Sequence, residues 1–343
     1  MIKQKRILIV RPDRIGDVVL STPLPREIKK KYPDSYVALL LRNYTRGVYI
    51  NNPYIDKVIL IDDNGYAPGS LKWFLEKRSE IRHERFTHSL TLLPTERLNY
   101  LLFFSGIPYR VGVGHKFYQF ITMTKYVNRK KYIPLRHEAD YCMDLARKIG
   151  IETADLTTEI FLSAEELEKV NKIRSGLLSD RKYSIGIHAT SGNSAPNWKP
   201  EEYRDLIMKL KRNSSIQVVV TDNVVPLGLA EIEDVVYPNK GASLRESIIN
   251  IAALNLLISA STGPMHLAAA LKVKTLSMFC PLTACSPKLW GPIGNENGII
   301  MPEEGYCGSV CPGDPKKCVF EGVGGIDAGK VLDHLYVFLR ESE

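Results

Sequence analysis

Short runs of apolar residues recur along the first half of the chain, and segments with helical spacing separate them. The runs lie at residues 6–10, 36–41, 57–61 and 89–93. An uninterrupted apolar run of this length is typical of a strand that is buried on both faces of a sheet. The alternation of such strands with helices predicts a parallel sheet that is covered by helices on both faces.

A second series begins after a looser segment at residues 150–163. Ser163 and Glu166 have the spacing of a capping box that starts a helix. Further strand-like runs follow at residues 184–188, 217–221, 256–259 and 275–279. The pattern therefore predicts two α/β domains, at residues 1–160 and 161–327. An amphipathic helix is expected within residues 328–343, and the sequence leaves open whether it packs back on the first domain.

Charge is distributed unevenly over the 343 residues. The net charge is +8, and residues 1–160 contain 27 Lys and Arg against 17 Asp and Glu, so the first half carries +10 and the rest −2. A basic half suits an anionic partner such as an anionic membrane surface, a phosphorylated glycan or nucleic acid. A lysine-rich surface that is simply solvated is the alternative, and no nucleic-acid-binding motif is present.

Targeting and common catalytic motifs narrow the function classes further. Residues 7–10 are too short an apolar run for a signal peptide, and no window approaches the ~18–20 apolar residues of a membrane span. We therefore expect a cytoplasmic protein whose contact with the membrane is peripheral. The chain contains no P-loop, H-E-x-x-H, G-x-S-x-G or strand-linked G-x-G-x-x-G motif, which weighs against metalloproteases, serine hydrolases and common dinucleotide oxidoreductases.

Three of the six cysteines crowd near the C-terminus, at Cys307, Cys311 and Cys318. Their C-x3-C-x6-C spacing lacks the paired C-x2-C turns of a zinc site. We expect three reduced thiols in a surface loop and no metal. The alternative is a metal or redox clip with Cys280 or Cys285 as a fourth ligand.

Polar residues that directly follow predicted strands are the candidates for chemistry, because open α/β sheets bind ligands beyond the carboxyl ends of their strands. Gly16 and Asp17 follow the first strand, where Asp17 could also serve only as an N-cap or first-turn acid. The small polar loop at residues 188–198 and the turn at residues 259–266 resemble anion-binding turns, because each precedes a helix.

Three segments in this order resemble glycosyltransferase family 9, the ADP-heptose:lipopolysaccharide heptosyltransferases. They are Ile7-Leu-Ile-Val10 leading into Arg14-Ile-Gly-Asp17, His188-Ala-Thr-Ser191, and Ser261-Thr-Gly-Pro-Met-His266 with its Leu-Ala-Ala-Ala continuation. Residues 106–112 and 137–150 match more weakly, so the resemblance extends over nearly the whole chain.

The resemblance implies a GT-B fold, in which two Rossmann-like domains with parallel sheets face a central cleft. It also implies inverting sugar transfer with no cofactor and no essential metal. Asp17 matches the general base of the family, and the acceptor is expected on the first domain. Thr190 and Ser191 match the loop that lies over the donor in the family. Thr262, Gly263 and His266 match the family's contacts to the donor diphosphate.

Two positions depart from the family pattern. Ser261 stands where the family usually has Asp, and Pro196 stands where it usually has Lys. Lys199 is the candidate to replace that cation, and Asp222 is the candidate to contact the donor ribose. Ser261 is retained as a donor-site residue. Candidate acceptor contacts are Arg14, Arg97 and Arg110.

The resemblance therefore predicts transfer of a heptose, or a related sugar, from ADP-heptose to a phosphorylated, lipid-linked acceptor of the lipopolysaccharide core. The expected location is the inner face of the inner membrane. Two alternatives remain open. One is a nucleotide-sugar isomerase of similar architecture, and the other is a catalytically silent homologue that binds nucleotide sugars.

Overall fold

The computed structural model describes residues 4–61, 70–130, 132–311 and 313–340. The chain divides into two compact units, residues 1–159 and 160–343. Each unit contains a six-stranded sheet in which every pair of neighbouring strands is parallel. Both sheets have the same order of strands when each is counted along its own unit.

In the first unit the strands are arranged as β3-β2-β1-β4-β5-β6. Their bounds are β1 (Arg6–Val10), β2 (Tyr36–Arg42), β3 (Lys57–Ile61), β4 (His88–Thr91), β5 (Tyr109–Val113) and β6 (Lys125–Val127). The helices are α1 (Ile15–Leu20), α2 (Pro23–Lys31), η1 (Asn43–Tyr49), α3 (Leu71–His83), α4 (Glu96–Phe104), α5 (Phe117–Ile121) and α6 (Glu138–Arg147). Apolar residues of α3 and α4 pack on one face of the sheet and share a common core with it. Helix α2 contacts β2, and helix α6 contacts β4 and β5.

In the second unit the strands are arranged as β12-β11-β10-β7-β8-β9. Their bounds are β7 (Tyr183–His188), β8 (Ile216–Val220), β9 (Val235–Val236), β10 (Leu256–Ala260), β11 (Lys274–Met278) and β12 (Ile299–Ile300). The α-helices are α7 (Ala164–Leu177), α8 (Pro200–Leu210), α9 (Leu244–Ala252), α10 (Gly263–Ala270), α11 (Pro287–Trp290), α12 (Tyr306–Ser309) and α13 (Ala328–Arg340). The 3-10 turns are η2 (Leu227–Leu229), η3 (Thr283–Cys285) and η4 (Glu296–Gly298).

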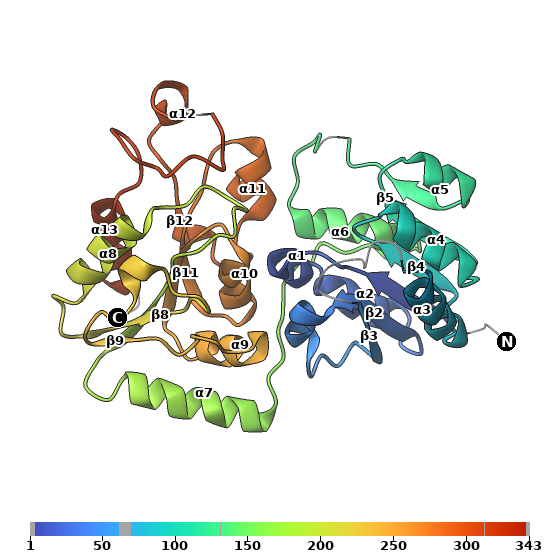
Figure 1. The fold of residues 1–343 in the computed structure, drawn as a ribbon, viewed down its shortest axis with the longest axis horizontal. Coiled ribbons are helices and arrows are strands. Elements are labelled where there is room, and N and C mark those ends of the chain that lie inside the picture. The colour runs from blue at the N-terminus through green and yellow to red at the C-terminus, as the bar shows by residue number, and fades with distance from the viewer. Residues whose placement is uncertain (1–3, 62–69, 131, 312, 341–343) are drawn as a thin grey trace. The chain divides into compact units, whose positions relative to one another are not determined.

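Helices cover both faces of the second sheet, with α8 and α13 on one side and α9 and α10 on the other (Figure 1). The C-terminal helix α13 buries Val331, Leu335 and Leu339 in the core of this unit. The structure thus places α13 with the second unit, which answers the question that the sequence left open.

All eight strand-like runs of the sequence form strands, with ends displaced by at most two residues. The capping box is also present, because Ser163 and Glu166 exchange side-chain to backbone hydrogen bonds of 3.2 and 2.9 Å. Sequence analysis missed β5, β6, β9 and β12. Arg110 and Gly112 interrupt the apolar run of β5, and the other three strands have only two or three residues.

Each sheet reverses its direction of growth next to its first strand. The neighbours at these points are β1 with β4 and β7 with β10. In open α/β sheets, loops that leave the carboxyl ends of such a pair diverge to opposite sides and form a ligand crevice. No helix in the described residues is long and apolar enough to cross a membrane.

Candidate functional site

A buried arginine organises the segment that follows β1. The Arg11 guanidinium forms ion pairs with Asp13 at 3.0 Å, with Asp17 at 3.4 Å and with Glu138 at 3.3 Å. Its Nε also donates to the Asp17 backbone carbonyl at 3.0 Å. Arg11 therefore fixes both the backbone and the carboxylate of Asp17.

Negative charge exceeds positive charge in this cluster. Glu138 lies at the start of α6 and also pairs with Arg129 at 2.7 Å, so three carboxylates share two guanidinium groups. Burial raises the pKa of Asp13 to about 6, against the opposing effect of Arg11. Burial likewise raises the pKa of Asp17, and Arg11 again opposes it. A carboxylate with a raised pKa is a better proton acceptor near neutral pH.

Asp17 is the most accessible of the three carboxylates. Its side chain is 24% exposed, compared with 10% for Asp13 and 2% for Glu138. It lies in the first turn of α1, while Arg14 occupies the N-cap position without a side-chain cap. Asp17 is therefore not the N-cap, but it is a first-turn acid, as the alternative interpretation expected. The carboxylate is partly open and paired with a buried cation, an arrangement that can receive a proton from a bound hydroxyl.

The three candidate acceptor arginines have different surroundings. Arg14 is exposed beside Asp17. Arg97 donates to the Ser70 carbonyl at 2.8 Å and stacks on the Trp73 ring.

Arg110 corrects the sequence prediction. Its guanidinium is buried and donates to the carbonyls of Ile107 and Thr122. Burial also lowers its pKa. These contacts tie β5 to the segment after α5, so the Arg110 side chain supports the fold instead of facing a ligand.

Asp222 also has a different role from the one expected. Its side chain is fully buried, and its two carboxylate oxygens accept hydrogen bonds from the backbone amides of Ala189 and Thr190, each at 2.9 Å. A carboxylate that is fully buried beneath the loop and bound to its amides does not face a ribose at the surface. Asp222 therefore positions the loop after β7, and its assignment as a ribose contact is not supported.

Hydrogen bonds from the Asn197 and Trp198 side chains hold the rest of that loop. Asn197 donates to the Ala189 carbonyl at 2.7 Å and accepts from the Tyr203 hydroxyl at 2.7 Å. Trp198 donates to the Ile326 carbonyl at 2.6 Å. Anchored in this way, the loop presents Thr190 toward solvent.

The turn after β10 ends in an unsatisfied hydroxyl. Thr262 is the N-cap residue of α10, but its side chain makes no capping hydrogen bond. It is only 5% exposed, and its Oγ1 has no hydrogen-bond partner among the described residues. A buried hydroxyl without a partner costs free energy, so a ligand oxygen is the expected partner. His266 is buried in the same turn of the helix.

The two turns of the second unit leave neighbouring strands. Ser259 of β10 pairs with His188 of β7, so the loop that contains Thr190 and the turn that contains Thr262 begin side by side at the carboxyl edge. The amides at the start of α10 and its helix dipole attract anions there. The structure thus brings together the predicted residues Thr190, Ser191, Ser261, Thr262, Gly263 and His266 at one edge of the sheet.

Lys199 is separate from this group. Its ammonium pairs with Glu321 at 2.5 Å, and both side chains are largely exposed. It lines a hollow of about 660 Å³ formed mainly by residues 319–330, which none of the other predicted donor residues lines. The structure therefore does not bring Lys199 to the anion site.

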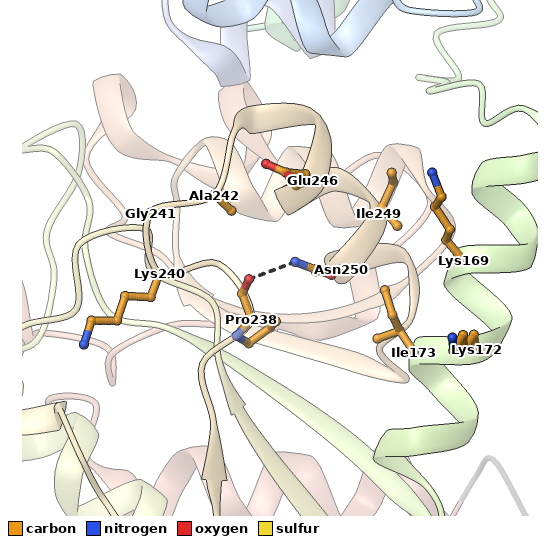
Figure 2. Close-up of a pocket in the computed structure, with 10 residues that line it drawn as sticks. All are labelled: Lys169, Lys172, Ile173, Pro238, Lys240, Gly241, Ala242, Glu246, Ile249 and Asn250. Atoms are coloured by element: carbon orange, nitrogen blue, oxygen red, sulfur yellow. Dashed lines mark hydrogen bonds between the residues drawn. The ribbon is translucent and has the colours of Figure 1, made fainter.

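A second hollow, of about 590 Å³, contains none of the predicted site residues (Figure 2). Lys169 and Lys172 of α7 line one side, and Lys240 lies on the other with its ammonium pointing away. Asn250 is engaged with the Pro238 carbonyl at 3.1 Å. Because the lysines do not converge, this hollow is a weaker candidate for an anionic ligand than the α10 turn.

All the cysteines except Cys142, which lies in α6, are in the second unit after β11. Cys318 is buried, so the expected surface loop is wrong for this residue. Cys307 contacts both Cys280 and Cys311, and Cys318 contacts Cys311. Burial raises the pKa of the Cys307 thiol to about 11. All six cysteines are free thiols, and the described residues contain no group of three or more His, Cys, Asp or Glu that could hold a metal ion. The absence of metal stays a prediction.

Comparisons with known proteins agree with this description. Residues 78–312 match the model of glycosyltransferase family 9 (heptosyltransferase). A Haemophilus influenzae protein, described in general terms as a glycosyltransferase, is 27% identical over 86% of this chain and 88% of its own length. Lipopolysaccharide heptosyltransferase 2 of Salmonella typhimurium is 23% identical over 98% of this chain and 99% of its own.

A solved structure shows the same fold. The family 9 glycosyltransferase of Veillonella parvula superposes with a TM-score of 0.81 at 22% identity, and the match covers 99% of both chains. The predicted GT-B class, with two Rossmann-like units, is confirmed. The family match spans more than half of the chain, so this protein is a glycosyltransferase that belongs to family 9, the heptosyltransferases.

Proposed function

We propose that this protein is an inverting, metal-independent glycosyltransferase that moves a heptose from ADP-heptose to a phosphorylated acceptor of the lipopolysaccharide core. The observation that carries the proposal is the buried hydroxyl of Thr262 at the start of α10, which has no hydrogen-bond partner within the described ranges of the chain. The heptosyltransferase family and the lipopolysaccharide enzyme at 23% identity support the sugar and the acceptor class.

In the proposed reaction an acceptor hydroxyl attacks the anomeric carbon of the donor. The bond from that carbon to the diphosphate breaks, and ADP leaves. Asp17 removes the proton of that hydroxyl, and Arg11 holds the Asp17 carboxylate in place. The amides at the start of α10, together with Thr262 and His266, stabilise the departing diphosphate. Arg14 and Arg97 remain the proposed acceptor contacts. The mechanism requires that Asp17 and the α10 turn both reach the substrates during turnover.

We place the reaction in the cytoplasm, at the inner face of the inner membrane. The support is the +10 charge of residues 1–160, which favours a phosphorylated acceptor and an anionic surface. The departures at Ser261 and Pro196 favour one rival, a homologue that binds nucleotide sugars without turnover.

The experiment combines purified protein, ADP-heptose, a heptose-deficient lipopolysaccharide acceptor and EDTA. We expect release of ADP, an acceptor heavier by one heptose, and an inverted anomeric centre by NMR. Donor binding without ADP release would instead identify a silent binding protein. Conversion of ADP-heptose in the absence of acceptor would identify an isomerase. Transfer that EDTA abolishes would contradict the metal-independent mechanism.

A further inference from the structure

The segment formed by α5 and β6 exposes its apolar side chains. Phe117 is 78% exposed, and Phe120 and Met123 are each 77% exposed, with Ile121 and Tyr126 about half exposed. We call these five residues the α5 patch. Adjacent exposed aromatic and aliphatic side chains are unusual on a soluble surface and mark a site of interaction.

The polar side chains of the same segment point inward. Gln119 is buried, where its Nε2 donates to the Val113 carbonyl at 3.1 Å and its Oε1 accepts from the Lys116 amide at 2.8 Å. Thr122 is fully buried and accepts from Asn99 at 2.6 Å. Surface helices ordinarily bury their apolar side and expose their polar side. In this segment the buried hydrogen bonds keep the polar side chains inside, so the fold itself places the apolar side chains outside.

Exposed lysines flank the α5 patch along the chain. No Asp or Glu occurs between Glu96 and Glu138, whereas this interval contains eight Lys and Arg, of which Arg110 is buried and Arg129 and Arg136 are paired with acids. Lys116, Lys125 and Lys130 are exposed in or beside the segment. Apolar side chains that enter the acyl boundary, with lysines at the level of the phosphates, are the features of a peripheral membrane contact. Two copies of the patch would repel each other through these lysines, which weighs against self-association.

We propose that the α5 patch binds the surface of an anionic phospholipid bilayer. The inference deepens the proposed function and rests on it only for the membrane-linked acceptor. Phe117 and Phe120 insert, while Lys116 and Lys125 contact lipid phosphates. The patch would hold the first unit at the surface that carries the acceptor.

The test is flotation of the full chain with vesicles of phosphatidylcholine alone, or with one quarter phosphatidylglycerol, in 0.1 M NaCl. The patch variant carries Phe117→Ser and Phe120→Ser. Its matched control carries Leu227→Ser and Val323→Ser, which are 96% and 90% exposed in the second unit. We expect at least tenfold weaker binding to the anionic vesicles for the patch variant and less than a twofold change for the control. Lys116→Gln with Lys125→Gln should remove the preference for anionic vesicles.

A second variant reports insertion without loss of the apolar surface. Phe117→Trp should keep full binding, and its fluorescence should shift to the blue on anionic vesicles, whereas Leu227→Trp should show no shift. The proposal is overturned by equal binding of patch variant and control, or by equal binding of the unmodified protein to both kinds of vesicle. A dimer in solution that the patch variant abolishes would also overturn it. No sugar is present in these assays, so their failure leaves the transfer proposal untouched.

Discussion

Arg11 decides how the acid cluster of the first unit behaves. A buried guanidinium beside three carboxylates compensates charge that would otherwise be costly to bury. Because Arg11 contacts both the carboxylate and the backbone carbonyl of Asp17, it acts as a positioning residue for the proposed base. Asp17 keeps an open side toward solvent, which Asp13 and Glu138 lack.

The first prediction concerns Asp17→Asn. The amide keeps the size of the side chain but cannot accept a proton, so the transfer rate should fall by at least ~10²-fold. ADP affinity should be unchanged, because the donor turn is in the other unit. Glu96→Gln is the matched control, since Glu96 is also a first-turn acid of the first unit. Melting temperature, ADP binding and transfer rate should be measured on both. A normally folded Asp17→Asn protein with near-normal transfer would exclude Asp17 as the base.

The second prediction concerns the stability of Arg11→Met as pH changes. Without Arg11, burial should raise the pKa values of Asp13 and Asp17 further above their unfolded values. The folded protein then holds protons that the unfolded chain has lost, so its stability falls as pH rises from about 4 to 8. The free energy of unfolding should be only slightly below that of the unmodified protein near pH 5, and lower by ~3–5 kcal/mol at pH 8. Denaturant titrations across this range check it. A deficit that does not depend on pH would contradict the proposed compensation.

Two turns on neighbouring strands form the proposed anion site, and a different set of contacts fixes each turn. The buried Asp222 carboxylate fixes the loop after β7 through two amides, while helix α10 supplies its own amides after β10. The Thr262 hydroxyl is buried and has no hydrogen-bond partner in the part of the chain that the structure describes, so we propose it as a ligand contact.

The third prediction compares Thr262→Val with Thr275→Val. Both hydroxyls are buried and lack partners in the described part of the chain, but Thr275 lies within β11. Valine keeps the shape and removes an unsatisfied group, so neither change should destabilise the fold. Only Thr262→Val removes a hydrogen bond to a charged phosphate, and its Kd for ADP should rise about tenfold. Calorimetry with ADP measures this. Equal ADP affinities for the two variants would contradict the assignment.

At the scale of the whole chain, the same strand order occurs twice with different charge. Each unit has its own sheet and its own core, while the excess of positive charge lies in the first. From this division we propose that the nucleotide binds to the second unit and the anionic acceptor to the first.

The fourth prediction is that ADP alone protects only the second unit from hydrogen exchange. Binding should slow exchange at residues 262–266, because the amides at the start of α10 contact the diphosphate, whereas the amides of Ala189 and Thr190 are already bound to Asp222. The segment around Asp17 should be unchanged until an acceptor is added. Exchange followed by mass spectrometry, with and without ADP, checks this. Protection around Asp17 by ADP alone, with none at residues 262–266, would reverse the assignment of the two units.

Local pattern was sufficient for most of the fold. Apolar runs on both sides of residues 150–163 predicted eight of the strands, because a strand that is buried on both faces consists of consecutive apolar residues. The short strands β6, β9 and β12 could not be predicted in this way, because two or three residues are too few to form a recognisable apolar run. The α10 turn was visible because strand, turn and helix are continuous in the sequence.

By itself, the sequence determined the two α/β units, the family resemblance and the candidate residues at strand ends. Only the tertiary structure decided what surrounds each side chain. Glu138 is 127 residues from Arg11 and yet shares its charge, and Asp222 meets amides 33 and 32 residues away. The outward α5 patch likewise depends on Asn99, which precedes it in α4. Hydrogen bonds and ion pairs between distant residues depend on how the chain folds back, and this information is absent from any local pattern.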